Sequence, residues 1–193
     1  MKIKSYTIIL FIILVIISQI SFSQLPLTKI DVNGDLRTIE SGMLIVPPKN
    51  KYDKLIDSLD KNLKRNPSDT TSLFYSALLY YSYNQMIAEP AQRTKGTLES
   101  LTTAKDMIEK AIQIKMTDFR AHLLRAQIYR ELCYRFSGDE SWMFKAGEIA
   151  MRRKLFENYK DKNNKYYTHL IKIDGSKEYL YNKKRITSDY PIK

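Results

Sequence analysis

The stretch NPSDTTSLFYSALLY, residues 66–80, decides the fold that this sequence predicts. Pro67 ends a preceding helix, because proline lacks the backbone N–H that continues the helical hydrogen-bond ladder. Ser68 or Asp69 can then cap a new helix by accepting hydrogen bonds from its first backbone amides. One face of that helix carries residues at four- and three-residue steps: Leu73, Ala77 and Tyr80. The stretch therefore predicts the junction between two packed helices.

Outward from this junction, the same periodicity predicts five amphipathic helices joined by short connections. We expect them to run from Tyr52 to Arg65, from Ser68 or Asp69 to about Glu89, from Thr97 past Ile112, from Thr117 or Asp118 to about Phe136, and from about Asp139 through Trp142 to Asn163-Asn164. A short helix or strand around residues 179–185 and a loose tail at 188–193 complete the expectation. The chain has only six glycines and six prolines, too few for the many turns of a β-sandwich or barrel. The sequence thus predicts an all-α fold of antiparallel helical hairpins.

The junction and the helix that follows it resemble part of a tetratricopeptide repeat, a unit of two antiparallel helices. Ala104, Ile108 and Ala111 resemble the second helix of such a unit, and Ala126 and Tyr129 match Ala77 and Tyr80 in the next first helix. The resemblance covers roughly residues 55–136 and implies a short right-handed array of stacked hairpins. It implies close helix approach at the small residues, which are Ala77, Ala104, Ala111 and Ala126. It also implies that Tyr80 and Tyr129 fill the space between paired helices.

The repeat departs from the family pattern in several places. Ala77 and Ala126 are 49 residues apart, whereas the family period is about 34. The excess falls between Asn84 and Gly96, the usual tryptophan and glycine of the first helix are absent, and Met116 stands where a proline is usual. An unrelated helical bundle is therefore the alternative fold.

The first 23 residues resemble a secretion signal. A basic start is followed by a nearly unbroken apolar run from Thr7 to Ile20 and by small residues before a cut ahead of Gln24. An uncleaved membrane anchor is the alternative, although this run of about 14 residues is shorter than the roughly 20 that a spanning helix needs. Removing residues 1–23 would take away two lysines and no acid, which lowers the formal net charge from +11 to +9. We expect an exported protein, periplasmic or outer-membrane-associated in a bacterium, that meets no nucleic acid.

The rest of the chain divides into an arm at residues 24–50, a helical domain at 51–165 and a basic C-terminal extension at 166–193. The arm holds an Asn33-Gly34 turn signal that could close a small hairpin. Alternation of apolar and polar residues around the turn is poor, so we expect an extended arm packed across the helices. Acidic and amide side chains at residues 31, 33 and 35 have the spacing that begins a calcium loop, but Leu36 stands where its glycine belongs. An Asx-rich turn is the better interpretation.

The sequence shows no catalytic or metal-binding pattern. His122 is expected to be a packed or rim residue and His169 a surface residue, because neither has a partner at ligand spacing. Cys133, the one cysteine, is expected to be a small core residue. Four carboxylates could serve a helical hydrolase, although each has a simpler structural role: Glu131, Asp139, Glu140 and Glu148. We therefore predict a protein that is not an enzyme and needs no cofactor or metal, and keep the hydrolase as a third hypothesis.

In stacked hairpins the first helices of successive units line a concave surface. By the resemblance, this surface would carry Phe74, Leu78, Tyr81, Arg120, Gln127 and Arg130. Tyrosine and arginine suit a peptide groove because both bury a large area and keep a polar group for hydrogen bonding. Equally, these aromatic residues could simply cover one another and the N-terminal arm. The leading hypothesis is an adaptor or accessory subunit of a cell-envelope complex that binds a peptide or protein partner on this face.

Three basic runs support a second hypothesis. They lie at residues 152–154, 160–165 and 183–185. Such runs commonly form a solvated face, but they could also attract anionic lipid headgroups or an acidic polysaccharide at the envelope. The alternative function is therefore that of a basic lipid or polysaccharide binder.

Overall fold

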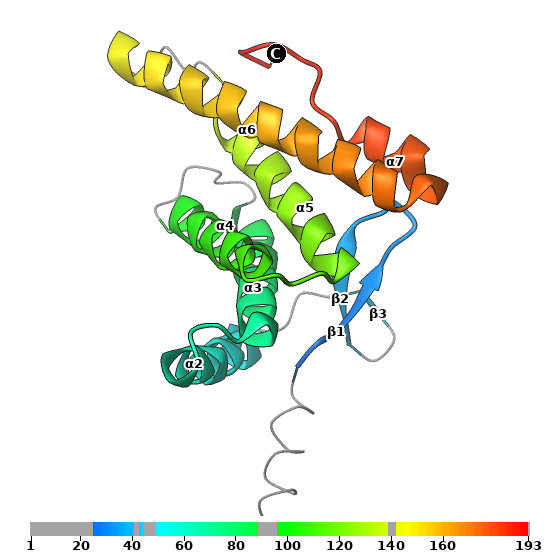
Figure 1. The fold of residues 1–193 in the computed structure, drawn as a ribbon. Coiled ribbons are helices and arrows are strands. Elements are labelled where there is room, and N and C mark those ends of the chain that lie inside the picture. The colour runs from blue at the N-terminus through cyan, green and yellow to red at the C-terminus, as the bar shows by residue number, and fades with distance from the viewer. Residues whose placement is uncertain (1–24, 41–42, 45–48, 89–95, 139–141, 193) are drawn as a thin grey trace, which may run out of the picture.

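The computed structural model describes residues 25–40, 43–44, 49–88, 96–138 and 142–192 of the chain. It is a mostly helical protein in which each helix packs mainly on the next one along the chain (Figure 1). The helices are α2 (Lys49–Arg65), α3 (Thr70–Ala88), α4 (Thr97–Gln113), α5 (Phe119–Arg135), α6 (Ala146–Ile173) and α7 (Glu178–Lys183), with a 3-10 turn η1 (Gly175–Lys177) before α7. The strands are β1 (Leu27–Ile30), β2 (Leu36–Glu40) and β3 (Met43–Leu44). The prediction of a mainly α-helical fold is confirmed.

Small residues let the central helices approach closely. All four of the predicted alanines are completely buried, and three of them belong to the core cluster that α3, α4 and α5 share: Ala77, Ala104 and Ala126, with Ala111 buried on α4. The two tyrosines that resemblance paired with them are not equivalent in space. Tyr80 sets its ring edge-on to Tyr52 of α2, whereas Tyr129 packs against Tyr159 and Tyr166 of α6.

The helix that begins near Asp139 in the prediction begins later and ends later in the structure. Its first residue is Ala146, and Trp142 lies outside it in an exposed turn. It continues through Asn163-Asn164, which the sequence marked as its end, and both side chains hydrogen-bond the C-terminal segment. Asn163 Nδ2 donates to the Lys184 carbonyl at 3.2 Å, and Asn164 Nδ2 donates to that of Ile186 at 2.9 Å.

The C-terminal tail, which the sequence predicts to be loose, makes hydrogen bonds to the loop that follows α5. The backbone N–H of Ile192 donates to the Ser137 carbonyl at 2.9 Å, and the Tyr190 hydroxyl bonds the Gly138 carbonyl at 3.2 Å. These contacts close a small apolar cluster made by Cys133, Phe136, Phe156 and Ile186. Within it the Cys133 thiol is fully buried and lies 3.6 Å from the Phe156 carbonyl.

The N-terminal arm is not extended but folds into a three-stranded antiparallel sheet in the order β1-β2-β3. The turn between β1 and β2 is held by the Asp31 carboxylate, which accepts the backbone N–H groups of Asn33 and Asp35, both at 2.9 Å. Gly34 has a φ of +75°, and a Cβ there would come within 3.3 Å of the Tyr181 ring. We call β1, this turn and β2 the N-terminal hairpin.

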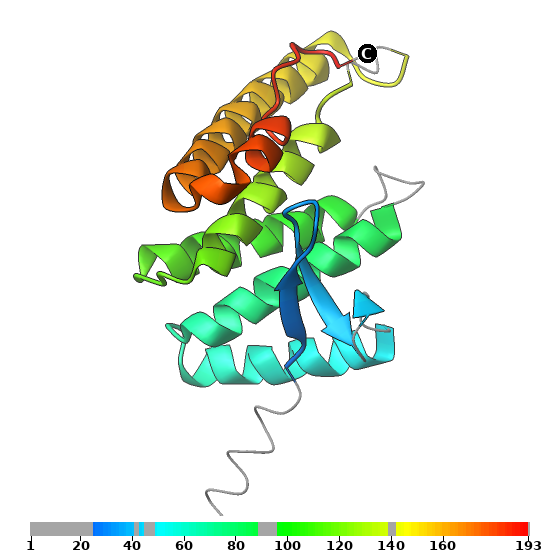
Figure 2. The same ribbon diagram turned by 90° about the vertical axis from the view of Figure 1, so that its right-hand side faces the viewer.

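The hairpin lies across the helices, in front of α3 and α5 in Figure 2. Leu36 of β2 is buried in the same core cluster as Phe74 and Leu78. The Gln127 amide of α5 pairs with both backbone groups of Leu36, accepting its N–H at 2.9 Å and donating to its carbonyl at 3.4 Å. The Lys184 ammonium, next to α7, is 2.6 Å from the Asp35 carboxylate. The expectation of packing across the helices is thus confirmed, although the arm's conformation was predicted wrongly.

Replacing Gln127 with alanine should lower the free energy of unfolding by about 1–3 kcal/mol, because two buried backbone groups of Leu36 lose their hydrogen bonds. Urea unfolding of the purified variants measures the change. Gln113→Ala, at an exposed position in the last turn of α4, is the matched control and should stay within about 0.5 kcal/mol of the unmodified protein. Equal losses in both variants would contradict the role given to Gln127.

Candidate partner-binding site

The structure covers half of the predicted partner-binding face. Phe74, Leu78 and Tyr81 are at most 5% exposed, because the N-terminal hairpin sits on top of them. The expectation that Phe74 and Leu78 line an open groove is therefore wrong. The structure agrees with the other interpretation, in which these residues pack against one another and against the N-terminal arm.

Arg120 lies at the first turn of α5 and fastens β1. Its guanidinium bonds both carboxylate oxygens of Asp118, with its Nε 3.1 Å and 3.0 Å away, and also reaches the Thr28 hydroxyl at 3.0 Å. Asp118 is the N-cap of α5 and accepts the backbone N–H of Arg120 at 2.8 Å. These bonds to Arg120 hold the pKa of Asp118 below its usual range. Arg120 thus holds the hairpin, and is engaged within the chain.

Three of the six predicted residues meet at a pocket, and the buried Tyr81 is one of them. Tyr81, Gln127 and Arg130 line a cavity of about 170 Å³ between the hairpin and α5, and its other walls are Asp35, Arg37, Glu131 and Tyr134. We call this cavity the hairpin pocket. Four of its residues belong to α5 at positions 127, 130, 131 and 134, the three- and four-residue steps that share one helical face.

The carboxylates of the hairpin pocket already have cations beside them. Asp35 pairs with Lys184 at 2.6 Å, and Glu131 pairs with Arg135 at 2.8 Å. Arg135 is held in turn by the side-chain oxygen of Asn84 at 2.7 Å. The charge of Glu131 is therefore balanced by a cation of the same helix.

Arg130 is the cation of the pocket that has no carboxylate within 4 Å among the described residues. Its guanidinium carbon lies 5.6 Å from the centre of the Tyr134 ring, and its Nε is buried without a hydrogen bond. Burial acts to lower the pKa of Arg130, but the phenols of Tyr167 and Tyr134, together with the charge of Asp35, outweigh it and hold that pKa above its usual range. A half-buried charge with an unsatisfied donor favours an acidic or carbonyl group supplied by a partner.

Sequence reasoning did not assign four residues of this pocket to partner binding, which are Asp35, Arg37, Glu131 and Tyr134. Tyr134 could have been found, because it follows Gln127 by seven residues and so shares its helical face. Asp35 and Arg37 carried no such signal, because their position depends on how the hairpin seats. Among the carboxylates considered for hydrolysis, Glu131 is ion-paired, and Glu148 accepts the backbone N–H of Lys145 at 3.0 Å at the start of α6. Asp139 and Glu140 lie outside the described residues.

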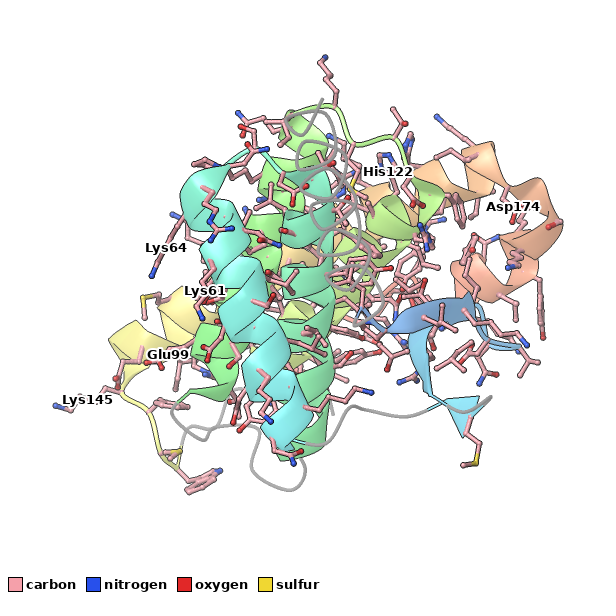
Figure 3. The ribbon with its side chains drawn as sticks, turned by 90° about the horizontal axis from the view of Figure 1, so that it is seen from below. Lys61, Lys64, Glu99, His122, Lys145 and Asp174 are labelled. Carbon is pink, nitrogen blue, oxygen red and sulfur yellow. The ribbon has the colours of Figure 1, made fainter. Side chains whose placement is uncertain are left out.

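The chain's two histidines lie together, which their separation in sequence did not reveal. The rings of His122 on α5 and His169 on α6 have centroids 5.3 Å apart (Figure 3 labels His122). Arg125 Nη2 lies 3.4 Å from His122 Nδ1. Burial, with the charges of Arg125 and His169, lowers the pKa of His122, while Asp118 acts in the opposite direction. No group of three or more metal-ligating side chains occurs among the described residues.

The depressed pKa of His122 makes the folded state sensitive to acid. Folding favours the neutral ring, so its contribution to stability is complete above the unfolded-state pKa of about 6.5 and is lost as the pH falls from there toward the folded-state pKa. We expect His122→Gln to flatten the fall in unfolding free energy between about pH 7 and pH 5. We expect His169→Gln to flatten it partly, because it removes one of the repelling groups. Urea titrations at several pH values test this, and identical profiles for His122→Gln and the unmodified protein would contradict it.

Comparison with known proteins adds no assignment to this geometry. No family model, no curated protein and no solved structure matches the chain.

Proposed function

We propose that this chain is an exported adaptor, built on stacked helical hairpins of tetratricopeptide type, that binds a peptide or protein partner at the hairpin pocket. The observation that carries the proposal is the convergence of Tyr81, Gln127 and Arg130 with Tyr134 around one accessible cavity. Tyrosine and arginine are the residue types that contribute most to binding energy at protein interfaces.

The hairpin itself indicates the kind of chain that this face accommodates. Gln127 holds Leu36 by its backbone N–H and carbonyl, so it recognises an extended main chain and not a particular side chain. Extended peptides commonly bind proteins through such main-chain hydrogen bonds, with side-chain pockets adding specificity. A partner segment that runs beside β2 would meet Arg130 and the 37%-exposed Tyr134 ring.

Arg130 sets the expected chemistry of the partner. No carboxylate lies within 4 Å of its guanidinium among the described residues, and its Nε is buried in the pocket wall without a hydrogen bond. An acidic side chain on the partner would satisfy it with charge-assisted hydrogen bonds. The N-terminal segment, expected to act as a secretion signal, supports placing this partner in a bacterial envelope, either in the periplasm or on the outer membrane.

Site-specific crosslinking in the producing cell tests the proposal. A photoreactive phenylalanine in place of Tyr134 should give one dominant adduct, and the added change Arg130→Ala should reduce its yield about tenfold or more, as for a truncated interface hot spot. The same crosslinker at Tyr179, which is more exposed and lies on α7, is the matched control and should give no such adduct. Adducts of equal yield at both positions, or none at Tyr134, would reject the pocket as the binding site.

A further inference from the structure

The basic runs of the C-terminal half do not form one surface. Lys184 is buried and paired with Asp35, and Lys160 bonds the Ser188 carbonyl at 2.8 Å. Lys162 places its ammonium 5.3 Å from the centre of the Tyr129 ring. In contrast, Arg153 and Lys154 near the start of α6 are exposed. Exposed cations therefore occur in separate places, and Arg153 and Lys154 form the pair near the start of α6.

That end of the molecule also exposes large apolar side chains. Trp142 is 78% exposed, Met143 is 52% exposed and Met151 is 59% exposed. Figure 1 shows that the first turns of α6 project beyond the end of α5, and in Figure 3 Lys145 points away from the helical body. We call residues 142–154 the α6 tip. It combines a tryptophan and two methionines with three exposed cations, which are Lys145, Arg153 and Lys154.

Internal contacts hold the two parts of the α6 tip together. The Arg152 guanidinium lies 4.6 Å from the ring centre of Phe144 and 5.3 Å from that of Phe136. Its Nη2 also donates to the Arg135 carbonyl at 3.1 Å. The turn that carries Trp142 and Met143 is thereby fixed against the helical turn that carries Arg153 and Lys154. Because the two parts are already held together, little conformational entropy would be lost when the apolar and basic side chains bind one surface.

We propose that the α6 tip binds the surface of a lipid bilayer that contains anionic headgroups. Tryptophan favours the boundary between headgroups and acyl chains, where its ring is apolar and its N–H stays hydrated. Lysine and arginine beside it are attracted by anionic headgroups, so burial of apolar surface and charge attraction favour the same orientation of the tip. Among the described residues no helix is both long and apolar enough to span a membrane. This role is independent of partner binding at the hairpin pocket.

The chain offers a direct readout, because Trp142 is its only tryptophan. We would titrate the full chain with vesicles of phosphatidylcholine alone and with vesicles that contain about 30% phosphatidylglycerol, an anionic lipid. The tryptophan emission should shift to shorter wavelength with the anionic vesicles only, and lipids brominated near the headgroup should quench it. High salt should weaken this binding, because it screens the attraction between the cations and the headgroups.

Matched charge variants separate the tip from the net charge of the protein. Arg153→Glu with Lys154→Glu should weaken binding about tenfold or more. Lys183→Glu with Arg185→Glu changes the same number of exposed cations around α7 and should leave binding unchanged. All variants keep residues 1–24, so any binding by that segment is common to them, and Trp142 reports on the tip alone. Met151→Ser should reduce the affinity without abolishing the preference for anionic lipid.

Three outcomes would overturn the proposal. The first is no spectral change with anionic vesicles, and the second is equal loss in both charge variants. The third is the same blue shift with a soluble acidic polysaccharide at matched charge, which would make the tip a polyanion site and not a bilayer site. None of these results bears on crosslinking at Tyr134, so the two proposals fail separately.

Discussion

The seating of β2 on α5 through Gln127 is the contact on which the organisation of this protein depends. One amide side chain satisfies both backbone groups of Leu36, and it does so where the Leu36 side chain enters the core beside Phe74 and Leu78. If these backbone groups were buried without a partner, the hairpin could not lie on the helices without a large desolvation cost. The amide therefore allows the part of β2 that β3 does not pair to be covered by helices, and it converts a potential open groove into a packed interior with the hairpin pocket beside it.

Much of the helical framework follows from local signals in the sequence. Asp118 caps α5, Thr97 begins α4, and the small residues expected at helix contacts are fully buried, because caps and periodicity act within one or two turns. The turn of the hairpin had a local signal in Asn33-Gly34, but the packing of its strands on the helices had none. Leu36 and Gln127 are 91 residues apart, so the burial that fixes the strand register depends on tertiary contacts alone. The helix end predicted at Asn163 and Asn164 was wrong for the same reason. Asparagine commonly ends helices, but here both side chains donate hydrogen bonds to carbonyls that are distant in the sequence.

The candidate site shows the same division. Gln127 and Arg130 could be identified as facing outward on one helix, but whether a face is open depends on what the rest of the chain places over it. The hairpin covers Phe74 and Leu78 and leaves Arg130 and Tyr134 accessible at its margin. Charge behaves similarly. A formal charge of +11 suggests one basic surface, yet part of it is used in internal pairs, and only some of the exposed cations, such as Arg153 and Lys154, lie close to the exposed Trp142 at the start of α6.

The sealing of the cluster around Cys133 bears on the redox chemistry of the chain. Burial raises the pKa of this thiol to about 12, so almost none of it is ionised at neutral pH. Thiol–disulfide exchange requires an accessible thiolate, and here both requirements are unmet. A chain with a single cysteine can therefore pass through an oxidising compartment as a monomeric thiol, without covalent dimers or mixed disulfides, as long as the C-terminal segment stays in place.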